Sequence, residues 1–206
     1  MDSKIERILA LDMSTKTGWA VFTVDGQDLA LLGFGQNTQI PESPGMYPEN
    51  FVEWAHQCYD AIITLIDKWK PDTLVIEETA SNSKSIYSQK ILEWIHYLVA
   101  KYIKESKIKA VYIMSGTWKS ETGVLMNGDE KKHNKAVKEY KAKNDTSIAY
   151  DPKGKRIGKI TRKHVAIRRA NEIFVKFLIK PLLKKDEDTA ESLLLGYCYC
   201  LRRMKV

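Results

Sequence analysis

The sequence predicts an α/β fold in which a mixed five-stranded sheet, an antiparallel meander followed by parallel strands, is flanked by helices. Residues 5–34 contain three short apolar segments separated by turn residues, which is the pattern of a meander. The middle of the chain alternates short apolar segments with long amphipathic ones, which favours parallel strands joined by helices. With 206 residues, 44% of them hydrophobic, the chain is large enough for one domain with a substantial core.

The meander is expected to have three strands. Residues 5–11 are largely apolar, with β-branched side chains near the start, as in a buried strand. Residues 18–24 are expected to form the second strand after a short turn, and residues 29–34 the third. Asp25-Gly26 lies between these two strands and is a favourable hairpin dipeptide.

Two long helices and two further strands follow. A helix is expected over residues 48–70, where apolar side chains recur at helical spacing until Pro71. Residues 73–76 are all apolar or β-branched, which is typical of a strand in the middle of a sheet. A second helix is expected from Ser83 to Lys104, and another strand over residues 110–114.

An insertion is expected next. Residues 124–159 are polar and lysine-rich, and we expect them to be helical only near residues 133–142. The whole chain, residues 1–206, is therefore predicted to be a single domain with a basic insertion at about 124–160.

Two helices are expected to complete the chain. Thr161 is suited to cap a helix over residues 161–178, and Pro181 would end it. The last helix is expected over residues 186–203.

Four acidic residues lie where ordinary folding does not favour a charge. Asp12 interrupts an apolar run, Glu77 ends another, and Asp188 and Glu191 open the last helix. A carboxylate at the end of a buried strand costs several kcal/mol of desolvation unless a cation or hydrogen bonds compensate it. If the four converge in space, their oxygens suit a hard divalent cation such as Mg²⁺ or Mn²⁺.

Each acid also has an ordinary explanation. Asp188 and Glu191 are three residues apart in the first turn of a helix, where the helix dipole favours negative charge. Asp12 could be a turn residue, and Ser14 and Thr15 could bond to it, bind a substrate phosphate or simply form the hairpin turn. Glu77 has no obvious partner nearby in the sequence. The set therefore fits one site better than several independent accidents.

Positive charge is concentrated in one segment. Residues 129–169 contain 14 Lys and Arg against 5 Asp and Glu, a net charge of +9, whereas the whole chain carries +7. Such a block attracts polyanions, most often nucleic acid phosphates. A solvated lysine-rich loop is the alternative.

Three segments resemble the motifs of RuvC-like Holliday junction resolvases, within the RNase H-like superfamily. The first hairpin of that family resembles Leu9–Ala20 (LALDMSTKTGWA), and its second motif resembles Leu74–Glu78 (LVIEE). Its C-terminal motif, Asp-x-x-Asp-Ala-Leu, resembles Asp188–Leu193 (DTAESL). The order and spacing agree over nearly the whole chain. Glu191 stands where the family has Asp, and the insertion is longer than the family's usual connection.

The resemblance implies a nuclease that resolves Holliday junctions by two-metal phosphodiester hydrolysis. Asp12, Glu77, Asp188 and Glu191 would hold two Mg²⁺ or Mn²⁺ ions about 4 Å apart, with Asp12 bridging them. One ion would activate the attacking water and the other would stabilise the leaving 3′ oxygen.

The resemblance also implies basic residues that contact DNA. Lys163, near the start of the penultimate helix, matches the family lysine that contacts the reacting phosphate, and Lys119 matches a lysine that follows the fifth strand. A junction should be recognised by its shape and phosphates. The candidate DNA-binding residues are Lys119, Lys131, Lys132, Lys155, Arg156, Arg162 and Lys163.

RuvC-like resolvases are two-fold dimers, so the resemblance further implies a homodimer with an isologous interface. The helix expected over residues 83–104, with Tyr87, Trp94 and Tyr97, is the candidate interface. A purely intramolecular core helix is the alternative.

Three other functions share some of these features. An RNase H-like nuclease acting on flaps, forks or RNA–DNA hybrids would use the same carboxylates. Actin-like and sugar-kinase ATPases have a similar first hairpin, but Ser14 replaces their glycine and 206 residues are short for two lobes. A non-catalytic DNA-binding protein would not need four intact acids.

Composition also bears on location. No apolar stretch approaches the roughly 18 residues needed to span a bilayer, and the charged N-terminus runs directly into a strand, unlike a signal peptide. Three cysteines without framework spacing fit a reducing compartment. We therefore expect a cytoplasmic protein with no membrane partner, in a bacterial cell or a phage-infected host.

Overall fold

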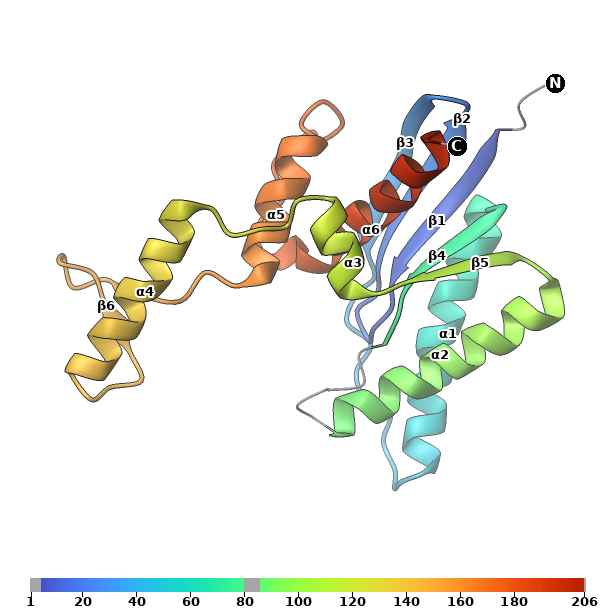
Figure 1. The fold of residues 1–206 in the computed structure, drawn as a ribbon. Coiled ribbons are helices and arrows are strands. Elements are labelled where there is room, and N and C mark those ends of the chain that lie inside the picture. Colours follow the sequence, from blue (N-terminus) through green and yellow to red (C-terminus); the bar gives the residue numbers. More distant parts are fainter. Residues whose placement is uncertain (1–4, 80–85, 206) are drawn as a thin grey trace.

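The computed structural model describes residues 5–79 and 86–205, and its centre is a five-stranded sheet with the order β3-β2-β1-β4-β5 (Figure 1). The first three strands pair antiparallel, whereas β4 runs parallel to β1 and β5 parallel to β4. This mixed sheet confirms the predicted fold class. The strands are β1 (Glu6–Asp12), β2 (Gly18–Asp25), β3 (Asp28–Gln36), β4 (Thr73–Glu77) and β5 (Lys109–Ile113).

Strand pairing places two of the predicted acids at the same edge of the sheet. Leu11 of β1 pairs with Ile76 of the parallel strand β4. The next residue on each strand, Asp12 and Glu77, therefore ends neighbouring strands at their carboxyl ends. In open α/β sheets this edge is the usual position of a ligand site.

Helices cover both faces of the sheet. The helices α1 (Glu49–Trp69) and α2 (Ile86–Ser106) pack on the face that carries Leu9 and Leu11, whereas α6 (Glu187–Met204) packs on the face that carries Ile8 and Ala10. Because successive side chains of β1 point to opposite faces and both faces are covered, its run is continuously apolar. Ser83, the expected start of the second helix, lies outside the described residues.

Two glycines allow α6 to lie close against the sheet. A Cβ at Gly196 would lie 2.9 Å from the Cβ of Ala10. A Cβ at Gly18 would collide with the backbone carbonyl of Asp188. Since Gly18 pairs directly with Asp12, this close approach brings the first turn of α6 next to the end of β1.

The segment after β5 has more regular structure than its composition predicts. The helix α4 (Gly128–Lys143) extends beyond the expected residues 133–142 because Asn127 and Glu130 form a capping box at its start. The helix α3 (Ser115–Glu121) and a hairpin of β6 (Ala149–Tyr150) and β7 (Arg156–Ile157) were not predicted. These elements are too short to show a hydrophobic period.

The helix expected over residues 161–178 is shorter than predicted. Thr161 caps α5 (Arg162–Ile173), as expected, but the helix stops before Phe174 rather than continuing toward Pro181. The amides of Phe177 and Leu178 both donate to the carbonyl of Phe174, which turns the chain out of the helix. A 3₁₀ turn at Lys184–Asp186 then leads into α6. In the described ranges, no helix has both the length and the apolar character that crossing a membrane requires.

Candidate active site

Three of the four predicted acids converge on one point. One carboxylate oxygen from each of Asp12, Asp188 and Glu191 lies within 4.8 Å of the other two. Asp12 comes from the end of β1, whereas Asp188 and Glu191 come from the start of α6. The donors are all oxygens, which is the ligand type that Mg²⁺ and Mn²⁺ prefer.

Glu77 lies at the end of the neighbouring strand, outside this group of three. Its Oε2 accepts a 2.6 Å hydrogen bond from Nε1 of Trp118, a buried residue of α3. Glu77 is nevertheless close enough to raise the pKa of Asp12 and of Glu191 by repulsion. Because 41 residues separate Glu77 from Trp118, this partner was not visible in the local sequence.

Burial and mutual repulsion disfavour the negative charge of the cluster. Burial raises the pKa of Asp12 well above its ordinary range, and repulsion from the other three acids raises it further. Burial also raises the pKa of Glu191. A cation among these oxygens would oppose both effects, so the donor set fits the divalent metal that the sequence predicts.

Lys163 lies beside the cluster at the second position of α5. Its Nζ is 3.1 Å from Glu187, 3.4 Å from Asp188 and 3.9 Å from Glu191. Burial alone would lower the pKa of Lys163, but the hydrogen bond to Glu187 and the neighbouring carboxylates raise it to about 12. The side chain therefore keeps its positive charge next to the acids.

Two more lysines contact the acids. The Nζ of Lys119 lies 3.3 Å from Glu191 and donates a 2.6 Å hydrogen bond to Ser115. The Nζ of Lys16 lies 3.7 Å from Asp188 and donates a 3.1 Å hydrogen bond to the carbonyl of Lys185. The sequence analysis did not select Lys16, although its position in the turn that follows Asp12 was a usable signal.

The hydroxyls of the β1–β2 turn stabilise the turn itself. The Oγ of Ser14 accepts a 3.0 Å hydrogen bond from the amide of Lys16, and the hydroxyl of Thr17 donates to the carbonyl of Ser14 at 2.8 Å. Thr15 accepts a 2.6 Å hydrogen bond from Gln39. Among the described contacts none joins Ser14 or Thr15 to Asp12, and those found are the contacts of a turn and of its neighbour Gln39.

The other predicted DNA-binding residues lie away from the acids. Two are on α4, two are in the β6–β7 hairpin and one begins α5, and all of them are exposed. These residues are Lys131, Lys132, Lys155, Arg156 and Arg162. Lys131, Lys132, Lys155 and Arg156 belong to a separate basic surface, considered below, whereas Arg162 directly precedes Lys163 on α5.

A cavity of about 290 Å³ adjoins Asp12 and Glu77. Gln89, Glu93 and His96 of α2 line its far wall. Burial lowers the pKa of His96 to about 4, so the imidazole is neutral near pH 7. The acids therefore border an open space that a substrate group can enter.

Neither the protein-family models nor the curated protein sequences give a match to this chain. Two solved structures, in contrast, match most of its length. The structure of Thermus thermophilus RuvC in complex with a Holliday junction substrate matches with a TM-score of 0.57 and 10% sequence identity, over 96% of this chain and 97% of that chain. The yeast mitochondrial Holliday junction resolvase Ydc2 matches with a TM-score of 0.53 and 13% identity, over 97% of this chain and 80% of that chain. The chain therefore shares its overall fold with these RuvC-type structures.

Proposed function

We propose that this protein is a metal-dependent endonuclease that cleaves Holliday junctions and related branched DNA. The observation that carries the proposal is the convergence of Asp12, Asp188 and Glu191 within 4.8 Å. Glu77 lies beside them at the carboxyl edge of a sheet with the RuvC fold. Clustered carboxylates in an open site are the ligands that metal-assisted phosphodiester hydrolysis requires.

Each residue of the site has a role in this mechanism. The four acids would hold the divalent ions, Mg²⁺ or Mn²⁺, at the carboxyl edge of the sheet. When bound, such ions lower the pKa of a water molecule and stabilise the leaving 3′ oxygen. Lys163, which keeps its charge beside the acids, would neutralise the scissile phosphate.

We also propose that two copies of the chain pair through α2. Tyr97 is 66% exposed and, with Trp94 and Glu93, lines a shallow hollow of about 310 Å³. Tyr87 is 45% exposed, and its ring also packs edge-on against Phe51, with the ring centroids 4.8 Å apart. A two-fold interface would give one active site for each of two symmetric strands.

The proposed function is tested by cleavage of a synthetic four-way junction with Mg²⁺ or Mn²⁺. Asp12→Asn keeps the size of the side chain and removes its charge, and we expect the cleavage rate to fall at least about a hundredfold. Asp60→Asn, at an exposed position of α1, makes the same charge change and should cleave at the wild-type rate. Full activity of the Asp12→Asn variant would exclude this acid cluster as the active site.

Substrate comparison in the same assay separates the alternatives. The same carboxylates would cut flaps, forks and RNA–DNA hybrids. If one of these is cleaved faster than the four-way junction, it is the preferred substrate. Binding without metal-dependent cleavage would favour a non-catalytic DNA-binding protein. Nucleotide hydrolysis by the purified protein would favour an ATPase.

A further inference from the structure

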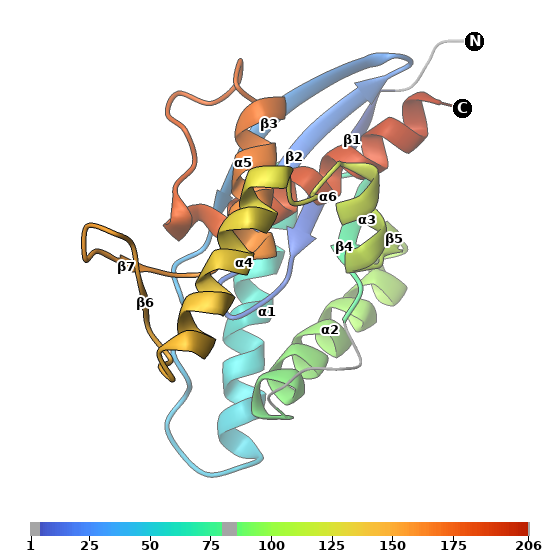
Figure 2. The same cartoon turned by 60° about the vertical axis from the view of Figure 1, so that its left-hand side comes forward.

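Residues 128–160, which we call the arm, project from the rest of the molecule. The arm comprises α4 and the β6–β7 hairpin. It extends away from the sheet and from α2 in Figure 1, and Figure 2 brings it forward, in front of α1. Within the arm, α4 packs on β6. A helix of 16 residues is about 24 Å long, so the arm has a considerable reach.

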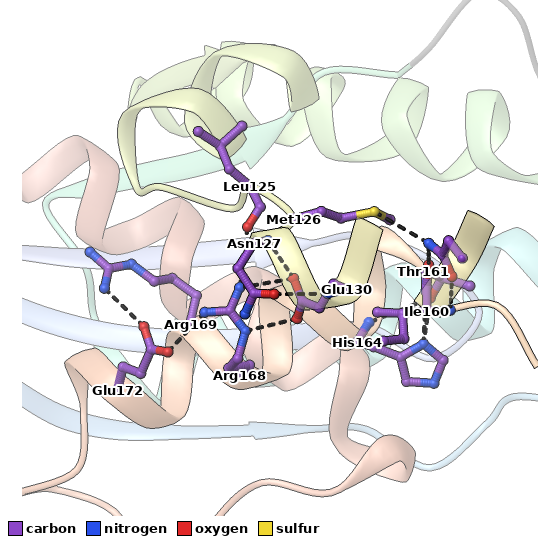
Figure 3. Close-up of polar contacts among 11 residues, drawn as sticks. Leu125, Met126, Asn127, Glu130, Ile160, Thr161, His164, Arg168, Arg169 and Glu172 are labelled. Atoms are coloured by element: carbon purple, nitrogen blue, oxygen red, sulfur yellow. Dashed lines mark hydrogen bonds and ion pairs between the residues drawn. The ribbon is translucent and has the colours of Figure 1, made fainter. Parts of the chain in front are cut away.

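The start of the arm is fixed to α5. Arg168 donates a 2.9 Å hydrogen bond to Oε1 of Glu130 and a 3.2 Å hydrogen bond to the carbonyl of Leu125 (Figure 3). Glu130 also accepts a 2.8 Å hydrogen bond from the amide of Asn127 in the capping box. Burial alone would raise the pKa of Glu130, but Arg168 and Asn127 lower it, so this ion pair persists at neutral pH.

A second set of contacts fixes the end of the arm. The side chain of Asn134 donates to the carbonyl of Ile160 at 2.9 Å and accepts from its amide at 2.7 Å. His133 Nε2 lies 2.8 Å from the carbonyl of Gly158. Thr161 then caps α5, and Lys163 follows two residues later at the acid cluster. The arm is therefore held in a set position relative to the candidate active site.

The arm carries an excess of positive charge. It contains 10 Lys and Arg and 5 Asp and Glu. Two of the acids are already engaged, because Glu130 bonds Arg168 and Asp151 accepts hydrogen bonds from two amides of its own hairpin turn. The lysine ion pairs of the arm are Lys132–Asp129 at 3.9 Å and Lys135–Glu139 at 3.8 Å. Both pairs are exposed, so they hold these lysines only weakly.

Arg168 and Arg169, at the end of the basic stretch of residues 129–169, make contacts within the protein. Arg168 is engaged with Glu130, and Arg169 donates a 2.8 Å hydrogen bond to the carbonyl of Thr122 and a 3.0 Å one to Glu172. These arginines connect α5 to the start of α4 and to the end of α3. The free positive charge lies on the arm itself.

We infer that the arm binds the phosphates of a DNA duplex beyond the cleavage site, an inference that rests on the proposed function for the choice of DNA as partner. Lys131, Lys135 and Lys138 are spaced four and three residues apart, so they form one exposed stripe along α4. A length of about 24 Å corresponds to about seven base pairs at 3.4 Å each.

The composition of the arm favours nucleic acid over a protein partner. Protein interfaces are depleted in lysine, and their cores are rich in apolar side chains. Val137 and Ala149 are buried inside the arm, and Tyr140 packs against Tyr150 at 6.4 Å. Lysine is the most frequent residue type among the exposed residues of the arm, and lysine recognises phosphates by charge without sequence preference.

The inference is tested by binding of full-length protein to labelled four-way junctions in EDTA, where cleavage is not required. One junction has arms of about 6 base pairs and the other has arms of about 20, shorter and longer than the estimated reach. The triple variant Lys131→Gln, Lys135→Gln, Lys138→Gln should bind the long-armed junction about tenfold more weakly, with a salt slope lower by about 2 to 3. Its loss of affinity for the short-armed junction, which offers fewer phosphates to the arm, should be smaller.

The matched control is Lys70→Gln, Lys104→Gln, Lys107→Gln, which removes the same charge from exposed positions at the far ends of α1 and α2. An equal loss of affinity in both triple variants, or an equal loss on both junctions, would overturn the inference. Wild-type cleavage of the short-armed junction by the arm variant would show that its active site is intact. If no variant and no wild-type protein cleaves, the proposed nuclease function fails while the binding comparison still decides the role of the arm.

A further variant tests whether the arm must be held in place. Arg168→Met keeps every lysine of the arm and removes the hydrogen bonds that Arg168 donates to Glu130. We expect it to weaken binding mainly of the long-armed junction, by a smaller factor than the triple variant. Unchanged affinity would overturn the claim that the anchored position of the arm matters.

Discussion

Two consecutive residues of α3 hold two different acids of the candidate site. Trp118 donates its only polar hydrogen to Glu77 at 2.6 Å, and Lys119 lies 3.3 Å from Glu191. Lys119 also lies over the Trp118 ring, 4.7 Å from its centroid. A hydrogen bond to an ionised carboxylate is stronger than one between neutral groups. Trp118 is therefore a positioning residue for Glu77.

Replacing Trp118 by Phe should loosen Glu77 while keeping most of the buried ring. We expect kcat for junction cleavage to fall about tenfold with little change in KM, because the acid is displaced and substrate binding is not. The free energy of unfolding should fall by about 1 to 2 kcal/mol. Steady-state cleavage and urea denaturation measure the two effects.

Trp54→Phe is the matched control. Trp54 is also buried and also donates its indole N–H, to the carbonyl of Ile40 at 3.0 Å, but it does not contact the acids. It should lose a similar amount of stability and cleave junctions at the wild-type rate. A comparable loss of kcat in this control would mean that the Trp118 effect arises from stability rather than from Glu77.

At the scale of elements, Glu6 of β1 connects its own strand to β4, β5 and α6 at the end of the sheet opposite the candidate site. Its carboxylate accepts hydrogen bonds from Thr73 of β4 at 2.6 Å, Lys109 of β5 at 3.2 Å, and Tyr199 and Arg203 of α6 at 3.0 and 2.8 Å. Burial alone would raise the pKa of Glu6, but these donors lower it to about 2.

This contact predicts a pH-dependent stability. The pKa of Glu6 is lower in the folded state than in the unfolded state, so its contribution is complete above the unfolded pKa of 4.5 and is lost as the pH falls toward 2. Glu6→Gln should reduce the free energy of unfolding by about 2 kcal/mol near pH 7, with allowance for solvent screening. The difference from wild type should shrink between pH 4.5 and pH 2 in urea titrations. A difference that does not change with pH would rule out the charge of Glu6 as its source.

Elements with a long hydrophobic pattern could be predicted from the sequence, and short ones could not. The strands β1 to β5 and the helices α1 and α6 lie within a few residues of their predicted ranges, because each has an apolar run or a clear period. The helix α3 buries only Trp118, and each hairpin strand has two residues, so neither shows a pattern. The end of α5 depends on a turn at Phe174, which propensity does not indicate.

The same contrast applies to the candidate site. The four acids were visible because a charge in an apolar run is unusual, and three of them converge in the structure. Trp118 was not selected because its contact with Glu77 spans 41 residues, whereas Lys16 was missed although it lies in the turn after Asp12. Their roles follow from the packing of α3 and α6 against the sheet, which only the folded chain defines.

At the scale of the whole molecule, the acidic cluster and the basic arm are two separate charged regions. The acids lie at the carboxyl edge of the sheet, half-buried or buried, with three lysines in contact. The arm carries its lysines in solvent, where they extend the positive field toward a polyanion. Under the proposed function, this division would let the arm attract DNA phosphates while the acids bind cations.

The proposed dimer makes a prediction for the whole assembly. Replacing Tyr97, which is 66% exposed on α2, by Glu would place two like charges near the two-fold axis of an isologous interface. Light scattering should then show a monomer where the wild type is a dimer. Because one monomer carries one active site, a supercoiled plasmid with an extruded cruciform should be nicked on one strand rather than cut on both.

Tyr112→Glu is the control for this prediction, since Tyr112 is 44% exposed on the edge strand β5 and lies outside the hollow at Trp94. It should remain dimeric and should cut both strands. If both variants are monomeric, the interface includes the sheet edge as well as α2. If the wild type is itself monomeric on the junction, the two strands must be cut by separate binding events, and the nicked plasmid would accumulate before the linear form for every variant.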